Sequence, residues 1–130
     1  MINESQPNGA DEHGSRVLIA GSRTFNDYPL LCEEMKKFYR VHITEIVCGM
    51  AKGADSLGER WAREHRVKVT YFPALWDKYG KSAGIIRNHQ MGDYADFLLA
   101  FWDGKSHGTK DMIEYMKKLG KHGRVVIFED

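Results

Sequence analysis

The sequence of 130 residues has little of several features that would set a protein's class at once. Its two cysteines, Cys32 and Cys48, form no C-x-x-C pair and have no zinc-ligand spacing, so we expect two reduced thiols and no metal site. The 19 lysines and arginines nearly balance 18 acidic residues. This balance disfavours a protein that coats nucleic acid, although it allows local basic patches. No apolar stretch approaches the roughly 20 residues that span a bilayer, so we expect no membrane partner.

The amino-terminal segment also lacks the apolar run of a secretory signal, so we expect a cytoplasmic protein. Met1–Ser15 is polar, contains glycine and proline and shows no hydrophobic period, which is typical of a disordered tail. The remaining residues, 16–130, have the length of one domain and are numerous enough to build a core.

Short apolar runs alternate with helical patterns along this domain. The runs are poorly alternating and rich in Val, Ile, Leu and Phe, which is typical of strands buried on both faces: Val17–Ala20, Glu45–Cys48, Val67–Phe72, Phe97–Trp102 and Arg124–Phe128. Apolar residues at helical spacing predict four helices: Pro29–Val41, Asp55–His65, Ser82–Tyr94 and Lys110–Leu119. The alternation predicts a three-layer α/β domain with a five-stranded parallel sheet, for which the commonest strand order is 3-2-1-4-5.

Three predicted strands end in loops that mix glycine with Ser, Thr, Lys or Arg. These loops are "GSRTFND" (Gly21–Asp27), "GMAKGADS" (Gly49–Ser56) and "DGKSHGTKD" (Asp103–Asp111). In the predicted order their strands are neighbours, so the loops meet at one sheet edge, where ligands of such sheets bind. Neither G-x-x-x-x-G-K-[ST] nor G-x-G-x-x-G is present, so the standard phosphate-binding motifs are missing.

Glycine before a helix lets an anion approach the unpaired N–H groups of the first turn. We therefore expect one cradle at Gly49 and Gly53, with Asp55 or Ser56 capping the next helix, and a second that comprises Gly104, Gly108, Ser106 and Thr109. Arg23, Lys52 and Lys105 could add positive charge. The alternative is that these glycines only make the turns.

The segment Ala74–Ala95 is unusually polar and aromatic around its helix. Arg87 and Met91 share a helical face, so Arg87 either forms a structural ion pair or reaches toward an anion. Trp76, Tyr79 and Trp102 are candidates for stacking on a base, although Trp102 could equally be core. His89 and His107 are weaker candidates for acid–base chemistry, because a lone loop histidine is more often incidental.

In combination, "RVLIAGSRTF", "CGMAKGADSLGERWA", "RNHQM" and "AFWDGKSHGTKDMI" resemble the SLOG superfamily. That Rossmann-like group includes the Lonely-guy nucleotide phosphoribohydrolases and the DNA-processing protein DprA, and the resemblance is nearest to its YspA/cpYpsA-related branch. It extends from Arg16 to Phe128 and implies a Rossmann-like pocket for a nucleotide or nucleotide-derived small molecule. Superfamily members often pair, so a homodimer or higher homo-oligomer is expected. Loops and resemblance together predict these ligand-binding residues: Gly21, Ser22, Arg23, Gly49, Lys52, Gly53, Ala54, Asp55, Arg87, Asn88, Trp102, Asp103, Gly104, Ser106, Gly108 and Thr109.

In the Lonely-guy enzymes an arginine in R-K-x-x-M and a glutamate in P-G-G-x-G-T-x-x-E serve N-glycosidic cleavage. Arg87, Asn88 and Met91 resemble the first motif, and Gly108–Thr109 resembles part of the second, but Met112 stands at the position of the glutamate. The nearest carboxylates are Asp111 and Glu114, with Asp55, Glu59 and Asp103 as other substitutes.

The sequence thus favours a protein that binds a nucleotide-like molecule to sense or sequester it, without a cofactor. The first alternative is a nucleotide phosphoribohydrolase or N-glycosidase that uses Arg87 with Asp111 or Glu114. The second is single-stranded DNA binding, which the near-neutral charge disfavours.

Overall fold

The computed structural model of the protein describes residues 14–37, 42–49 and 52–129. Most of the predicted tail, residues 1–13, lies outside this range, as does the end of the first predicted helix, residues 38–41. The elements in chain order are β1 (Ser15–Gly21), α2 (Tyr28–Lys36), β2 (Ile43–Cys48), α3 (Ala54–Glu64), β3 (Lys68–Tyr71), α4 (Trp76–Tyr79), the 3-10 turn η1 (Gly80–Ser82), α5 (Ala83–Tyr94), β4 (Phe97–Trp102), α6 (His107–Lys118) and β5 (His122–Ile127).

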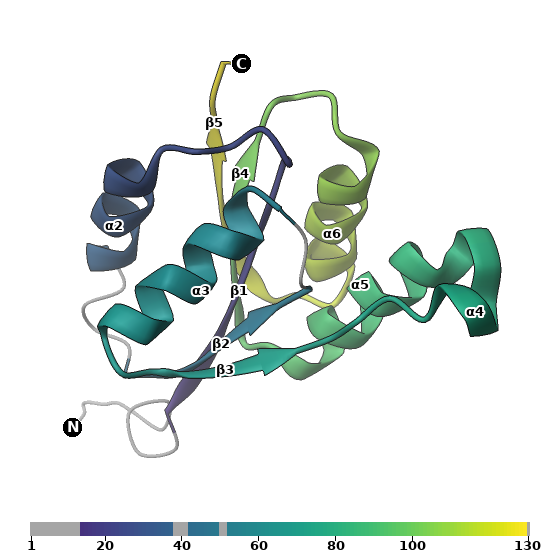
Figure 1. Ribbon diagram of the computed structural model, residues 1–130, viewed down its shortest axis with the longest axis horizontal. Coiled ribbons are helices and arrows are strands. Elements are labelled where there is room, and N and C mark those ends of the chain that lie inside the picture. Colours follow the sequence, from purple (N-terminus) through teal and green to yellow (C-terminus); the bar gives the residue numbers. More distant parts are fainter. Residues whose placement is uncertain (1–13, 38–41, 50–51, 130) are drawn as a thin grey trace.

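The five strands form one parallel sheet in the order β3-β2-β1-β4-β5, as the sequence predicts. The central strand β1 pairs with β2 on one side and β4 on the other, with Val17 opposite both Ile46 and Phe97. The domain is therefore Rossmann-like, and the chain changes direction across the sheet between β3 and β4. Figure 1 shows helices on both sides of this sheet.

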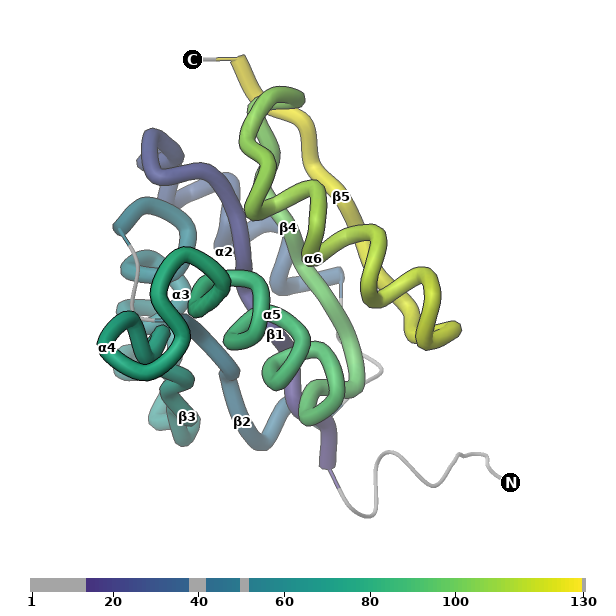
Figure 2. Tube along the Cα trace, turned by 90° about the vertical axis from the view of Figure 1, so that its right-hand side faces the viewer, coloured from purple at the N-terminus to yellow at the C-terminus, as the bar shows by residue number. Residues whose placement is uncertain are grey.

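Two apolar clusters cover the two faces of the sheet, because successive residues of a strand point to opposite sides. Val17 and Ile19 pack with Leu31 of α2 and Ala62 of α3, and Phe25 stacks on Phe101 at 4.3 Å between ring centroids. Leu18 and Ala20 face the other side, with methionines of α5 and α6: Met91, Met112 and Met116. Figures 1 and 2 agree that α2 and α3 lie on one face and α5 and α6 on the other.

Several helix and strand boundaries in the structure differ from the predicted ones by a few residues. Ser15, assigned to the tail, begins β1, because its backbone pairs with the start of β2. β5 begins at His122 and not at Arg124, because the exposed edge strand carries polar residues that hide its start. Sequence periodicity misses the short helix α4, and no helix among the described residues has the length and apolar character required to cross a membrane.

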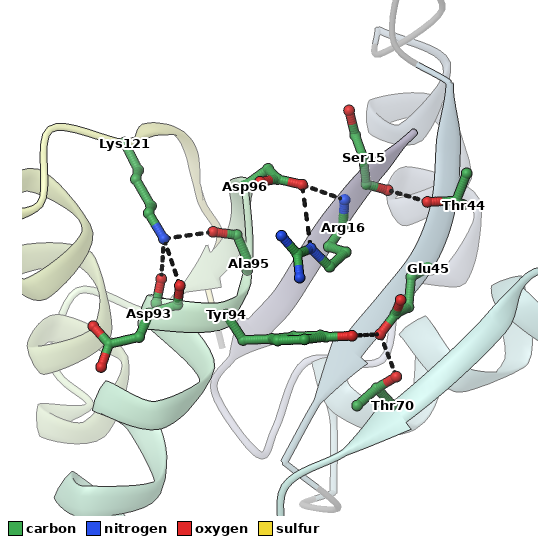
Figure 3. A network of polar contacts seen from close by, with 11 residues as sticks. Ser15, Arg16, Thr44, Glu45, Thr70, Asp93, Tyr94, Ala95, Asp96 and Lys121 are labelled. Atoms are coloured by element: carbon green, nitrogen blue, oxygen red, sulfur yellow. Dashed lines mark hydrogen bonds and ion pairs between the residues drawn. The ribbon is translucent and has the colours of Figure 1, made fainter. Parts of the chain in front are cut away.

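Polar contacts fill the space near the amino ends of the strands (Figure 3). Arg16 Nε lies 3.5 Å from Asp96 Oδ2, and the hydroxyls of Tyr94 and Thr70 both donate to the buried carboxylate of Glu45. Lys121 Nζ donates to three carbonyl oxygens at the carboxyl end of α5, at 2.8–2.9 Å. This network ties β1, β2, β3 and α5 together at the end of the sheet opposite the predicted loops.

Candidate functional site

A cavity of about 440 Å³ lies at the carboxyl ends of β1 and β4. This is the point where the strand order reverses, which is the usual ligand site of open parallel sheets. Ten residues of the predicted set line it: Gly21, Ser22, Arg23, Asp55, Arg87, Asn88, Asp103, Ser106, Gly108 and Thr109. The first and third predicted loops therefore share one cavity.

Most of the other lining residues come from η1 and α5. Sequence reasoning missed as lining residues Ala20, Thr24, Lys81, Gly84, Ile85, Met91 and Met112. Lys81 and Gly84 come from a segment that no strand-end pattern marks, so only the tertiary contact of α5 with the sheet brings them here. The one usable signal was the polar and aromatic character of the stretch from Ala74 to Ala95.

The second predicted loop contributes in another way than expected. Gly53 has φ +76°, and a Cβ built there would strike the backbone oxygens of Ser22 and Arg23. Gly53 does not line the cavity; it lets the second loop pack against the first. Gly53 therefore shapes the contact between the two loops, and the anion cradle at this glycine stays a prediction.

The start of α3 also differs from the prediction. The N-cap is Gly53, which has no side chain, so neither Asp55 nor Ser56 occupies the predicted N-cap position. Instead, the buried Asp55 carboxylate accepts the N–H of Gly49 at 3.0 Å and lines the cavity. This hydrogen bond ties Gly49, the residue after β2, to the first turn of α3. Residues 50–51 of the second loop lie outside the described residues.

Gly49 makes room for Arg87. A Cβ built on Gly49 would lie 2.6 Å from Arg87 Nη1, which donates to the Gly49 oxygen at 2.5 Å and to the Phe72 oxygen at 3.4 Å. No ion pair holds Arg87 within the described part of the chain. Its guanidinium is positioned by these two backbone oxygens and by Asn88 Oδ1, which accepts from Nε at 3.2 Å, while it lines the cavity. Gly49 itself does not line the cavity, but it decides where this cation lies.

The third loop is organised by Asp103. Its carboxylate accepts the N–H of Ser106 at 2.8 Å, the N–H of Lys105 at 2.9 Å and the Ser106 hydroxyl at 3.0 Å. These bonds, the Ser106 N–H first, lower the pKa of Asp103 to about 2. The Ser22 hydroxyl accepts the Asp103 N–H at 3.2 Å and lies 3.0 Å from the Ser106 hydroxyl, which links the first and third loops.

Four other predicted binding residues lie outside the cavity wall: Lys52, Ala54, Trp102 and Gly104. Ala54 is buried where a Cβ on Gly21 would meet it. The Trp102 indole N–H donates to the Ser106 oxygen at 3.0 Å, so its ring is a structural part of the third loop. Gly104 has φ +81° with open space around it, which indicates a turn and no close approach. Lys52 is exposed.

The predicted catalytic carboxylates Asp111 and Glu114 also fail to reach the cavity. Asp111 accepts from Asn88 Nδ2 at 3.4 Å and lies 3.3 Å from His89 Nε2, two side chains of α5. Met112 faces the cavity instead, because one residue along a helix turns the side chain by about 100°. Asn88 Nδ2 also donates to the Gly108 oxygen at 3.2 Å, which fixes the start of α6 to α5.

The carboxylates on the cavity wall are Asp55 and Asp103, and the cations are Arg23, Lys81 and Arg87. Glu59, a further substitute, instead accepts the Tyr71 hydroxyl at 2.8 Å. Among the described residues, no group of three or more His, Cys, Asp or Glu side chains could hold a metal ion.

Comparison with known proteins agrees with this architecture. The chain is 36% identical over 115 residues to the Gene 61 protein of Mycobacterium phage D29, an alignment that covers 81% of this chain and 90% of that protein. DNA processing protein A (DprA) from Streptococcus pneumoniae has the same fold, with a TM-score of 0.69 at 17% identity over 87% of this chain. The chain spans half the length of that DprA chain. A family model described as the YspA, cpYpsA-related SLOG family matches residues 15–79, and the chain belongs to this family.

Proposed function

We propose that the protein binds a nucleotide or a nucleotide-derived small molecule in the cavity between β1 and β4. The observation that carries this proposal is the meeting of two strand-end loops, the start of α6 and three cations on one cavity. Its volume of about 440 Å³ lies within the range of about 300–1,000 Å³ typical of small-molecule sites.

The charges around the cavity favour an anion at one end. Asp55 and Asp103 are already engaged by N–H groups of their own loops. The side chains of Arg23 and Lys81, in contrast, have no hydrogen bond or ion pair to any other described residue. A phosphate bound by Arg23 would share this cavity with the first turn of α6, whose N-cap Ser106 makes no side-chain capping bond.

Gly108 supports the same location for the anion. It lies in the first turn of α6, it lines the cavity, and a Cβ built on it would meet nothing within 4 Å. A ligand oxygen can therefore approach the backbone at this point without a side chain in the way. Thr109, buried beside it, adds a hydroxyl on the same wall.

The chemistry of the wall favours binding over cleavage. N-glycosidic cleavage needs a carboxylate at the anomeric carbon or a group that protonates the leaving base. Met112 faces the cavity where the resemblance places a glutamate, and Asp103, with a pKa of about 2, has no proton to donate near neutral pH. Asp55 is the carboxylate through which hydrolysis would have to proceed.

Calorimetry with ribose 5-phosphate, the four nucleoside monophosphates and ADP-ribose tests the proposal. We expect at least one of these probes to bind and to raise the melting temperature, because a ligand of the folded state stabilises it. Chromatography of the same mixtures should show no released base. Release of base would establish the hydrolase, and failure of every probe to bind would refute the proposed site.

A matched pair of charge variants locates the anion. Arg23→Gln should weaken the bound probe about tenfold, because it removes a charge-assisted hydrogen bond. Arg63→Gln removes the same charge at the far end of α3, where Arg63 pairs with Glu59, and should leave affinity unchanged. Equal loss in both variants would mean that net charge, and not the cavity, attracts the probe.

The oligomeric state and the cellular location stay predictions. Light scattering of the purified chain would test the homodimer. Retention of a single-stranded oligonucleotide that falls steeply with salt would instead support the DNA-binding alternative.

A further inference from the structure

A segment that borders the cavity exposes an unusual amount of apolar surface. Leu75 is 47% exposed, Trp76 57% and Ile85 52%. With Tyr71, they make up four of the seven large apolar side chains exposed among the described residues, and all four lie within fifteen residues of the chain. We call the stretch from Leu75 to Ile85 the lip. Figure 1 shows its helix α4 at the right-hand edge of the molecule, beyond α5.

The lip is continuous with the cavity wall. Lys81, Gly84 and Ile85 belong to both. The edge of the Trp76 ring lies over Gly84, since a Cβ built there would be 3.6 Å from its Cη2 atom and would meet nothing else within 4 Å. The exposed indole therefore stands beside the cavity, over the lining residue Gly84.

The other aromatic candidates are committed elsewhere. The Trp102 indole N–H is bonded to the Ser106 oxygen, and its ring packs against the cluster under α5 and α6. The Tyr79 ring has the Lys78 ammonium 5.1 Å from its centroid. Trp76 is thus the aromatic side chain beside the cavity with most of its surface still exposed.

We propose that Trp76 and Ile85 form the subsite for the planar base of the ligand, while the phosphate lies at Arg23 and the start of α6. This inference rests on the proposed function and adds the orientation of the ligand. A nucleotide has one charged end and one flat, weakly polar end. Arg23 and the start of α6 line the cavity at the strand ends, whereas the exposed apolar side chains lie at the lip, where Lys81 is the cation on the cavity wall. Stacking on an aromatic face is favourable for every base and stronger for larger ring systems.

The test compares two probes that differ only in the base, adenosine monophosphate and ribose 5-phosphate. Trp76→Ala should weaken the monophosphate about tenfold or more and change ribose 5-phosphate less than twofold, because only the base meets the lip. Trp76→Phe should keep most of the affinity. Purine monophosphates should lose more than pyrimidine monophosphates in the alanine variant. Thermal unfolding checks that each variant is folded, as expected for a side chain so exposed.

Fluorescence gives an independent reading. Binding of the monophosphate to the wild-type chain should quench tryptophan emission, and the quench should vanish in Trp76→Phe, in which Trp61 and Trp102 remain. If Trp76→Ala weakens both probes equally, or neither, the base subsite is wrong while the proposed function stands. If none of the nucleoside monophosphates nor ribose 5-phosphate binds the wild-type chain, the proposed function fails and the lip inference with it.

Discussion

The two ends of the sheet carry similar charged residues, but these residues are paired differently at each end. At the amino end, Arg16 faces Asp96, and the buried Glu45 accepts two hydroxyls, so the charged groups meet partners inside the chain (Figure 3). At the carboxyl end, carboxylates are engaged by their own loops, but Arg23 and Lys81 face a cavity without a partner among the described residues. Side-chain pairing within the chain thus characterises the first end, whereas at the second end two cations on the cavity wall are unpaired among the described residues.

The difference also explains the glycines. At the amino end, side chains contact one another, whereas at the carboxyl end the loops approach each other through backbone atoms. Gly53 allows the backbones of two loops to touch, and Gly49 leaves the space in which the Arg87 guanidinium lies. A glycine outside the cavity wall can therefore shape the wall through the neighbour for which it leaves space.

Gly53→Ala should break the carboxyl end and cause the largest change. The new Cβ would strike the Ser22 and Arg23 oxygens at a φ that disfavours side chains, so we expect a loss of about 3–5 kcal/mol in the free energy of unfolding. Gly104→Ala is the matched control: its φ is also positive but the space is open, and it should cost about 1 kcal/mol. Urea denaturation measures both, and equal losses would contradict the packed contact between the loops.

Glu45→Ala should break the amino end alone. It leaves the Tyr94 and Thr70 hydroxyls without their acceptor, which should cost about 2–3 kcal/mol. Glu45→Gln keeps an oxygen acceptor and should cost about half as much. Ligand affinity, measured well below the melting temperature, should not change in either variant. A parallel fall in affinity would mean that the two ends are coupled.

Gly49→Ala should separate binding from stability. The new Cβ would lie 2.6 Å from Nη1 of Arg87, a flexible side chain that can move away, so we expect at most about 1 kcal/mol of destabilisation. Affinity for the bound probe should fall about tenfold, because the displaced guanidinium no longer lines the cavity. In a double-mutant cycle, Gly49→Ala should add nothing to Arg87→Gln. Additive losses would show that Gly49 acts by another route.

The smallest expected effect concerns the titration of Asp103, which reports on the hydrogen bonds of the third loop. Its pKa of about 2 lies below that of an unfolded chain, near 3.9, so its contribution to stability is complete above about pH 4 and is lost as the pH falls toward 2. Carbon-detected NMR of the carboxyl group should give this low pKa. Ser106→Ala removes one hydroxyl donor and keeps both backbone donors, so the pKa should rise only slightly. A wild-type value near 4 would mean that the loop does not hold the carboxylate.

The strands were predictable because their environment is uniform. Val17–Ala20 and Phe97–Trp102 are buried on both faces, and such strands are continuous apolar runs whatever their neighbours are. The edge strand β5 was predicted two residues short at its start, since an edge strand needs no apolar run. The helix α4 was missed because one turn is too short to show a hydrophobic period.

The sheet edge at which the cavity lies was predictable from the sequence, whereas its lining residues were predictable only in part. Strand order alone places Ser22, Asp103 and Thr109 at one edge. Asp111 and Met112 differ by one position on a helix, and only the packing of α6 against the sheet decides which of them faces the cavity. Lys81 and Ile85 arrive from a segment with no strand-end motif, so nothing local marked them.

The sequence by itself determined the alternation of strands and helices, the parallel sheet and the edge at which polar loops gather, because periodic burial and turn residues are local properties of a chain. Only the tertiary structure decided which cations lack partners among the described residues, which glycines leave space for a neighbouring group and which aromatic ring is exposed at the lip. Those properties belong to pairs of residues distant in sequence, and their free energies exist only once the layers have packed.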